Sequence, residues 1–249
     1  MTIIGQMKKI TYSLLRILVF RKGRQVCING QLIRFPIEYS RYYPEGYEIE
    51  KQKFIEANCH GMTLDLGAHI GLYAVIMSRL STVVVAVEPS PKTRKALTNT
   101  LFLNNSSNVA IISNAISDKS GTSTIFMTND DVSNANSLFV AGKPHKVNTV
   151  CIDSFGVDFN FIKIDIEGAE LLALRGASRV LKKVQAMTIE IHPEILESTG
   201  QHKSEIWEIL DSENASIMHE GKVIDKIEFE RITGPFEIQV VFPMHGAEK

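Results

Sequence analysis

Two short segments of the chain carry ionisable side chains at every second position. In "KIDIEG" these are Lys163, Asp165 and Glu167, and in "TIEIH" they are Glu190 and His192. Side chains two residues apart on a β-strand point to the same face. Because unpaired buried charges are costly, we expect these groups to emerge together into a cleft where two neighbouring strands end.

Such a cluster suits proton transfer. His192 is the first candidate for a general base, since an unperturbed imidazole titrates near neutral pH. Asp165 is the other contender, Glu190 belongs to the same catalytic group, and Lys163 is expected to pair with a carboxylate. A structural role for Glu190 and His192, at a strand end before Pro193, is the alternative to catalysis.

Three of these four groups could also bind a metal ion. Asp165, Glu190 and His192 could form an oxygen-rich magnesium site. A single histidine with scattered acids is weak evidence for a metal, however. We therefore expect a metal-free reaction, with Mg²⁺ as the alternative.

The segment "LDLGAHIG" forms a second set, with Asp65 at its head, His69 within it, and Gly67 and Gly71 on either side of the histidine. Glycines at such positions let a partner approach the backbone closely. A helix that starts after the second glycine offers free N–H groups to an anionic ligand group. Glu88 follows 23 residues after Asp65 and can accept hydrogen bonds from both hydroxyls of a ribose. The set predicts a nucleoside pocket.

Two cofactors fit a nucleoside pocket. A dinucleotide site favours G-x-G-x-x-G, whereas this segment reads D-x-G-x-x-x-G. Asp65 would repel a pyrophosphate but would favour a cationic amino group or a sulfonium, and S-adenosylmethionine carries both. We therefore expect S-adenosylmethionine, and we keep an NAD-dependent oxidoreductase as the alternative function.

The elements that position these residues alternate along the chain. Runs rich in Val and Ile are separated by helical patterns, which is typical of a parallel sheet covered on both faces. The predicted strands are 61–67, 81–89, 108–117, 159–168 and 186–192, and the predicted helices are 47–58, 71–80, 91–104, 169–183 and 203–213. Three further strand-like segments, 215–220, 222–230 and 236–242, follow with only turns between them. They predict that the sheet ends in antiparallel pairing.

Residues 1–45 are expected to form an N-terminal appendage, a basic helix followed by a β-hairpin, ahead of one domain over residues 46–249. The hairpin is indicated by the Asn29-Gly30 turn in "RQVCINGQLIRFPI". The apolar run "ITYSLLRILVF" is too short to span a bilayer. A helix packed on its own domain is the first interpretation of this run, and peripheral contact with an anionic membrane is the alternative.

Composition sets further limits. The net charge of -1 argues against nucleic acid as a partner. The three cysteines are odd in number and fit no metal spacing, which favours buried thiols in a reducing compartment. We expect a cytoplasmic protein, membrane-associated if the basic N-terminus binds lipid. Oligomeric state is not predicted.

These motifs together resemble one family. The stretches "LDLGAHIGLYAVIMSRL", "VVAVEPSPKTRKAL", "FIKIDIEGAELLALRGA" and "MTIEIH" look like the FkbM family of S-adenosylmethionine-dependent methyltransferases. The resemblance covers about residues 60–195, and K-x-D-x-E-G-A-E is its most specific part. It implies an α/β, Rossmann-like class I methyltransferase fold with a seven-stranded, mostly parallel sheet and an antiparallel terminal strand.

The resemblance also implies a function and a set of cofactor contacts. Methyl transfer to a hydroxyl of a sugar, a glycan or another small natural product is expected, and a non-catalytic nucleoside-binding scaffold is a further alternative. The residues implied at the cofactor are Asp65, Gly67 and Gly71 at the methionine end, Glu88 at the ribose, and Asn114 and Ala115 at the adenine. His69, in the glycine loop, and Asp165 are further candidates for contact with the cofactor. Asn114 stands where related methyltransferases carry an acid, but its amide can still bond the adenine edge.

Overall fold

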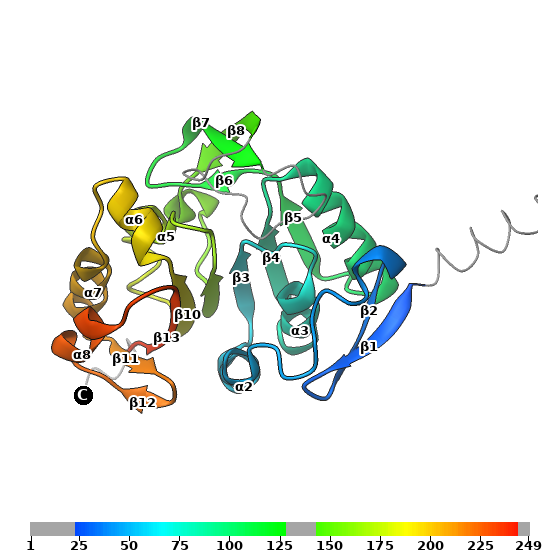
Figure 1. Cartoon of the computed structure of the whole chain (residues 1–249), viewed down its shortest axis with the longest axis horizontal. Helices are drawn as coiled ribbons and strands as arrows, with labels where there is room; N and C mark the ends of the chain where they lie inside the picture. Colours follow the sequence, from blue (N-terminus) through cyan, green and yellow to red (C-terminus); the bar gives the residue numbers. More distant parts are fainter. Residues whose placement is uncertain (1–22, 128–142, 244–249) are drawn as a thin grey trace, which may run out of the picture.

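The computed structural model describes residues 23–127 and 143–243. Its main sheet has the strand order β12-β11-β13-β10-β9-β3-β4-β5 (Figure 1). The strands are β3 (Met62–Leu66), β4 (Val83–Val87), β5 (Val109–Ile112), β9 (Phe161–Ile164), β10 (Ala186–Ile191), β11 (Ser216–His219), β12 (Lys222–Val223) and β13 (Phe236–Val241).

The sheet confirms the predicted fold class. Strands β5, β4, β3, β9 and β10 pair in parallel, and β13 pairs antiparallel with both β10 and β11. These seven strands are joined by the two-residue β12, which pairs with β11 through a turn at Glu220 and Gly221. Both turn residues have positive φ, 48° and 75°, as a two-residue hairpin turn requires.

One face of the sheet is covered by α2 (Ile49–Asn58), α3 (Leu72–Leu80) and α4 (Pro91–Leu103). Helix α4 begins where the sequence predicts, because Pro91 occupies its first turn and the Ser90 hydroxyl accepts the Thr93 N–H. The predicted N-terminal hairpin forms as β1 (Arg24–Ile28) and β2 (Gln31–Phe35). Its buried side chains share one hydrophobic cluster with α3 and α4. The domain boundary at residue 45 stays a prediction.

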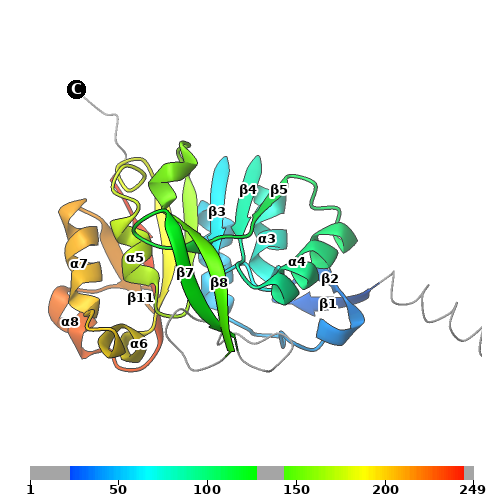
Figure 2. The ribbon, with the colours of Figure 1, turned by 90° about the horizontal axis from the view of Figure 1, so that it is seen from above.

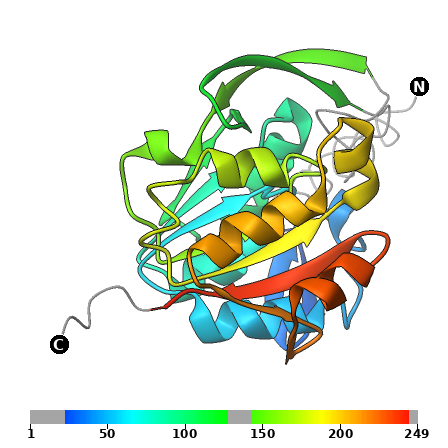
Figure 3. The same ribbon diagram turned by 90° about the vertical axis from the view of Figure 1, so that its left-hand side faces the viewer.

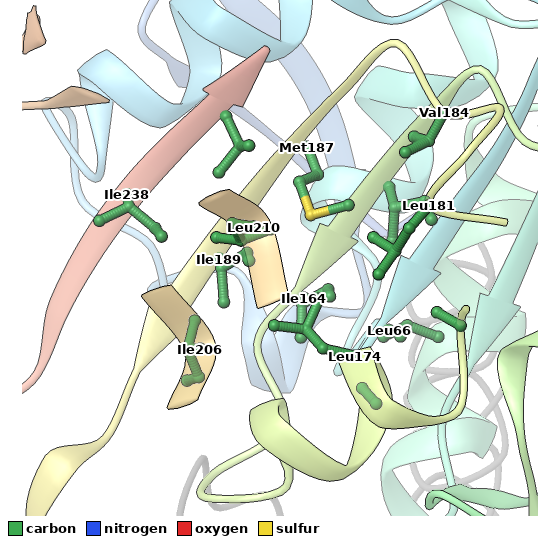
Figure 4. Packing of buried hydrophobic residues seen from close by; sticks show 14 of the residues in the cluster. Leu66, Ile164, Leu174, Leu181, Val184, Met187, Ile189, Ile206, Leu210 and Ile238 are labelled. Carbon is green, nitrogen blue, oxygen red and sulfur yellow. The ribbon is translucent and has the colours of Figure 1, made fainter. Parts of the chain in front are cut away.

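The other face is covered by α5 (Glu170–Arg175), α6 (Pro193–Ser198), α7 (Lys203–Ser212) and α8 (Lys226–Arg231) (Figure 3). Figure 4 shows how Leu174 of α5 and Ile206 of α7 pack against strand side chains such as Ile164, Ile189 and Ile238. This packing fixes the ends of β9 and β10, from which the ionisable residues emerge.

Three predicted elements are wrong in detail. Residues 222–230 were expected to form a strand, but α8 begins after Asp225, whose carboxylate and Glu228 form a capping box. The strand expected over 108–117 divides into β5 and β6 (Ala115–Ile116), which belong to different sheets. The helix expected over 169–183 ends its regular part at Arg175, before Gly176.

A second, three-stranded sheet has the order β6-β8-β7, with β7 (Gly121–Met127) and β8 (Lys143–Val150) forming a long ribbon in front of the main sheet in Figure 2. Short 3₁₀ turns lie at Ile37–Tyr39 and Ile152–Phe155. The predicted basic helix and the polar loop after residue 127 lie outside the described residues. Within the described part of the chain, the helices all lack the combination of length and hydrophobicity needed to cross a membrane.

Candidate functional site

A cleft with an empty volume of about 1000 Å³, partly open to solvent, lies where β3, β4, β9 and β10 end. Ligands bind at this edge in open α/β sheets. Its wall combines aromatic rings with ionisable groups. The aromatic side chains are Tyr43, Tyr47 and Tyr73, and the ionisable ones are His69, Glu88, Lys163, Asp165, Glu167 and Glu190.

Lys163 forms the floor of the cleft. It sits directly opposite Asp65 in the parallel register of β3 and β9, so the two side chains lie side by side. The Lys163 Nζ lies 3.2 Å from Asp65 and 3.6 Å from Asp165, and it also donates to the backbone carbonyls of Leu66 and Gly67. Burial opposes the charge, but the two aspartates raise the pKa of Lys163 above its usual value. Lys163 is therefore a buried cation.

The turn after β3 depends on Gly67. Its φ is +74°, and a Cβ at this position would lie 1.8 Å from the backbone carbonyl oxygen of Asp165. What comes close to this glycine is thus the chain itself, where β3 and β9 end together. Gly71, at φ +99°, lies against side chains of α4, and a Cβ there would be 2.9 Å from a Leu97 methyl carbon and 3.4 Å from the Thr100 methyl carbon. Both glycines shape the cleft by allowing close packing of the chain.

Glu88 lies at the tip of β4, as predicted, with an exposed fraction of 6%. One carboxylate oxygen accepts the His69 N–H at 3.0 Å, and the other accepts the Ser90 N–H at 2.9 Å. Burial raises the pKa of Glu88 to about 7, although both N–H groups act against this. The carboxylate is fixed in position and retains lone pairs for a ligand's hydroxyl groups.

His69 has a left-handed backbone, with φ at +50°, inside the glycine turn. The Tyr43 hydroxyl lies 2.9 Å from its Nδ1. Burial lowers the pKa of His69 to about 4, so the ring is neutral near pH 7. Its Nε2 is buried and has no hydrogen-bond partner among the described residues. A polar atom in this state fits a site that binds a ligand.

His192 lies between three carboxylates. Its Nδ1 is 3.0 Å from Glu170, and its Nε2 is 3.4 Å from Glu167 and 3.9 Å from Glu190. Burial opposes a positive charge here, but the hydrogen bond to Glu170 and the nearby carboxylates raise the pKa of His192 to about 9. The imidazolium form dominates at neutral pH and cannot accept a proton. The near-neutral pKa that made His192 the first candidate for a base does not hold in the folded chain.

A second buried lysine was missed in the sequence. Lys51, on α2, is 2% exposed, and its Nζ lies 2.8 Å from Glu48, 2.9 Å from Glu190 and 3.1 Å from Glu237. Burial again opposes the charge, but Asp165 and these glutamates raise the pKa of Lys51 well above its usual value. The sequence does not indicate that Lys51 is buried, because α2 has no clear apolar face and Lys51 resembles any surface lysine.

The structure brings most of the predicted site residues together. Those on the wall of the cleft are Gly67, His69, Glu88, Ala115, Lys163, Asp165 and Glu190. Asp65 is fully buried and lies 3.2 Å from Lys163, and Gly71, Asn114 and His192 are not among the residues that line the cleft. The chain after Ile164 has left the strand, so Asp165 and Glu167 belong to the following loop and not to a strand. Tyr43 and Tyr47 come from the irregular segment before α2, which carried no periodic signal.

The fit of a metal to this site can be judged from its ligands. Asp165, Glu190 and His192 do offer atoms within 4.8 Å of one another. Each of them already has a charged partner: Lys163 near Asp165, Lys51 on Glu190, and a proton on His192. A divalent cation would have to compete with these built-in cations. The group fits Mg²⁺ poorly.

The acidic groups outnumber the basic ones around the cleft. Lys51, Lys163 and His192 are shared among seven carboxylates: Glu48, Asp65, Asp165, Glu167, Glu170, Glu190 and Glu237. Such a cleft favours a ligand with positive charge. With the fixed Glu88 carboxylate and the unpartnered His69 Nε2, it fits a nucleoside carrying a cationic group, as S-adenosylmethionine does.

The solved structures that resemble this chain include methyltransferases at low sequence identity. An rRNA methylase from Streptococcus thermophilus has a TM-score of 0.49 and 12% identity, over 79% of this chain and 96% of that one. An O-methyltransferase from Bacillus cereus in complex with S-adenosylhomocysteine gives 0.46 and 13%, over 78% and 79%. Magnesium protoporphyrin IX methyltransferase from Synechocystis PCC 6803, with bound S-adenosylmethionine, gives 0.45 and 12%, over 79% and 77%. A search of curated proteins found no match.

A family model decides the class. The methyltransferase FkbM domain matches residues 65–220, from the head of the glycine turn to the end of β11. This span is more than half of the chain and contains Glu88, Lys163, Asp165 and His192. The match decides against the oxidoreductase and scaffold alternatives. The chain belongs to the FkbM family of S-adenosylmethionine-dependent methyltransferases.

Proposed function

We propose that the chain transfers a methyl group from S-adenosylmethionine to a hydroxyl of a sugar, a glycan or another small natural product. The observation that carries the proposal is the cleft where the parallel strands end, which is lined by tyrosines and by Glu88, fixed at the tip of β4. When bound, the cofactor supplies a methyl group made electrophilic by its sulfonium. The chain has to hold the cofactor, orient the acceptor and remove one proton.

The cofactor end of the cleft is assigned to β3 and β4. Glu88 would accept hydrogen bonds from the ribose hydroxyls, and Ala115 would lie beside the adenine. The turn from Gly67 to His69 would hold the methionine end of the cofactor. The buried His69 Nε2, which has no hydrogen-bond partner among the described residues, lies in this turn. Asp65 would act through Lys163, because it is fully buried behind that lysine.

The acceptor end is assigned to the tyrosines and the acids. Tyr47 is half-buried on the wall of the cleft and offers a ring on which the apolar face of a sugar can pack, and the buried Tyr43 and Tyr73 also line the cleft. Asp165 and Glu190 offer acceptors for hydroxyl hydrogen bonds. Both described lysines at the site are engaged with carboxylates, which favours a neutral or amino-bearing acceptor over a phosphorylated one. A small-molecule acceptor, and not nucleic acid, agrees with the net charge of -1.

We also propose that the reaction needs no metal, because the candidate ligands are neutralised by Lys51, Lys163 and the proton on His192. Methyl transfer should then survive treatment with EDTA.

The first experiment is a thermal-unfolding titration with S-adenosylhomocysteine and, in parallel, with NAD. At about a hundred times the dissociation constant, a ligand that binds only the folded state adds about 2.7 kcal/mol, or roughly 5 to 10 °C. We expect a shift with S-adenosylhomocysteine alone, reduced in Glu88→Ala. A shift with NAD alone would contradict the assignment of the cofactor.

The second experiment identifies the acceptor class. Methyl-labelled S-adenosylmethionine is incubated with matched sets of neutral sugars, amino sugars, sugar phosphates and hydroxylated aromatic compounds. We expect label in neutral or amino-bearing hydroxyl compounds. Exclusive labelling of sugar phosphates would contradict the acceptor assignment while leaving the cofactor assignment intact.

A further inference from the structure

The base that takes the acceptor proton follows from the contacts around the cleft. His192 is positively charged at neutral pH, so it has no lone pair to offer. Asp165 lies 3.6 Å from Lys163, and although burial opposes ionisation, the lysines keep its pKa below the usual value. Glu190 is ion-paired with Lys51 at 2.9 Å. The carboxylates of Asp165 and Glu190 are therefore both ion-paired with buried ammonium groups.

The Glu167 side chain is accessible from the cleft, and neighbouring residues hold it in position. It lies on the wall of the cleft, and its side chain is 21% exposed. Its backbone has φ at +51°, a conformation that non-glycine residues seldom adopt and that places this side chain at the turn after β9. Such strained residues gather at functional sites, where the surrounding structure holds them in place.

A chain of polar contacts stands behind Glu167. The His192 Nε2 lies 3.4 Å from its carboxylate, and the His192 Nδ1 donates to Glu170 at 3.0 Å. Glu170 is completely buried and also accepts the Gly168 N–H at 2.8 Å. The hydrogen bond from Nδ1 to Glu170 therefore fixes the orientation of the imidazolium ring, and its Nε2–H faces Glu167. An acid or base oriented by a histidine and a second carboxylate is the arrangement that positions groups for proton transfer.

We propose that Glu167, positioned by His192 and Glu170, is the general base that takes the proton of the acceptor hydroxyl. This inference rests on the proposed methyl transfer. Glu167 takes the proton as the acceptor oxygen forms its bond to the methyl carbon. The carbon–sulfur bond breaks in the same step, and its electron pair stays on sulfur. The products are the methyl ether, S-adenosylhomocysteine and a protonated Glu167.

The charges around Glu167 suit this role. Burial raises its pKa to about 7, with His192 acting against the rise and Asp165, Glu190 and Glu170 adding to it. A base with a pKa near the working pH combines a large ionised fraction with a useful affinity for the proton. His192 keeps enough of Glu167 ionised, and Glu170 keeps His192 charged.

The first test reads the carboxyl group directly and needs no acceptor. In protein labelled with ¹³C at the glutamate carboxyls, the signal lost in Glu167→Gln should titrate near neutral pH in the wild type. His192→Asn should move that midpoint upward, since it removes the neighbouring cation. Glu194→Gln, an exposed glutamate two residues after His192, serves as the control. A Glu167 signal that stays ionised down to pH 5 would overturn the proposal.

The second test reads turnover with the acceptor that the wild type methylates fastest. We expect Glu167→Gln to lower kcat by about 100-fold or more, while the dissociation constant for S-adenosylhomocysteine stays within about twofold. Glu167→Asp should keep part of the activity, and the acidic limb of the kcat–pH profile should vanish in Glu167→Gln. Turnover of Glu167→Gln within threefold of the wild type overturns the base assignment alone. A wild type that does not bind S-adenosylhomocysteine overturns the proposed function instead.

Discussion

Lys51 and Glu190 are 139 residues apart in sequence, yet their side chains form an ion pair at 2.9 Å beside the cleft. The lysine comes from α2, which precedes the first parallel strand, and the glutamate comes from β10. The same ammonium group also contacts Glu48 and Glu237. The Lys51 side chain thus connects α2 to two strands of the sheet, β10 and β13.

Removal of this cation should destabilise the fold strongly. Lys51→Met leaves three carboxylates close together without their partner, and the loss of one member of a buried ion pair costs about 3 to 5 kcal/mol. The free energy of unfolding in urea measures the effect. Lys53→Met is the control, because Lys53 is 61% exposed and its pair with Glu50 should contribute less than about 1 kcal/mol. Equal losses in the two variants would contradict the buried role of Lys51.

Gly67→Ala should disrupt the cleft through a backbone collision. An added Cβ would lie 1.8 Å from the Asp165 carbonyl oxygen, so the ends of β3 and β9 would have to separate. Gly156→Ala controls for the left-handed backbone alone, since Gly156 has a similar φ of +70° and no atom within 4 Å of its Cβ position. We expect a cost of about 1 kcal/mol in Gly156→Ala. Gly67→Ala should unfold at much lower urea and lose binding of S-adenosylhomocysteine.

The parts of the fold that could be predicted from sequence are those with local signals. The run of valines in β4, the Asn29-Gly30 turn and Pro91 at the start of α4 each act within a few residues. Helix α8 was missed because its apolar residues, Ile227 and Phe229, alternate as in a strand. Only the capping box between Asp225 and Glu228 marks it as a helix.

For the site, sequence could predict positions but not charge states. The strand tips of Glu88 and Asp165 follow from the alternation of strands and helices. The protonation of His192 depends on Glu170, which reaches it from the first turn of α5 only in the folded chain. The pairing of Lys51 likewise depends on the packing of α2 against β10 and β13. Contacts of this kind leave no local signature.

The charge on His192 predicts how stability changes with pH. Its pKa is raised from 6.5 to about 9 on folding, so its contribution is fully present below about pH 6.5 and is lost as pH rises to about 9. At 1.36 kcal/mol per pKa unit, this amounts to about 3 kcal/mol. The difference in unfolding free energy between wild type and His192→Asn should therefore shrink by about that amount from pH 6 to pH 9.5. His60→Asn, at an exposed position, is the control substitution, and a constant difference for His192→Asn would contradict the raised pKa.

The raised pKa of Glu88 predicts that the affinity for the cofactor increases as pH rises, whereas the stabilising contribution of His192 decreases. In the unliganded chain burial raises its pKa to about 7, whereas ribose hydroxyls would donate to the ionised carboxylate. Binding of S-adenosylhomocysteine should then release a proton, and affinity should fall about tenfold from pH 8 to pH 6. Calorimetry in buffers of different ionisation enthalpy measures both quantities. Glu88→Gln should bind more weakly at pH 8 and lose the pH dependence, whereas Glu167→Gln should retain it. If the dependence vanishes in Glu167→Gln and persists in Glu88→Gln, the ribose contact belongs elsewhere.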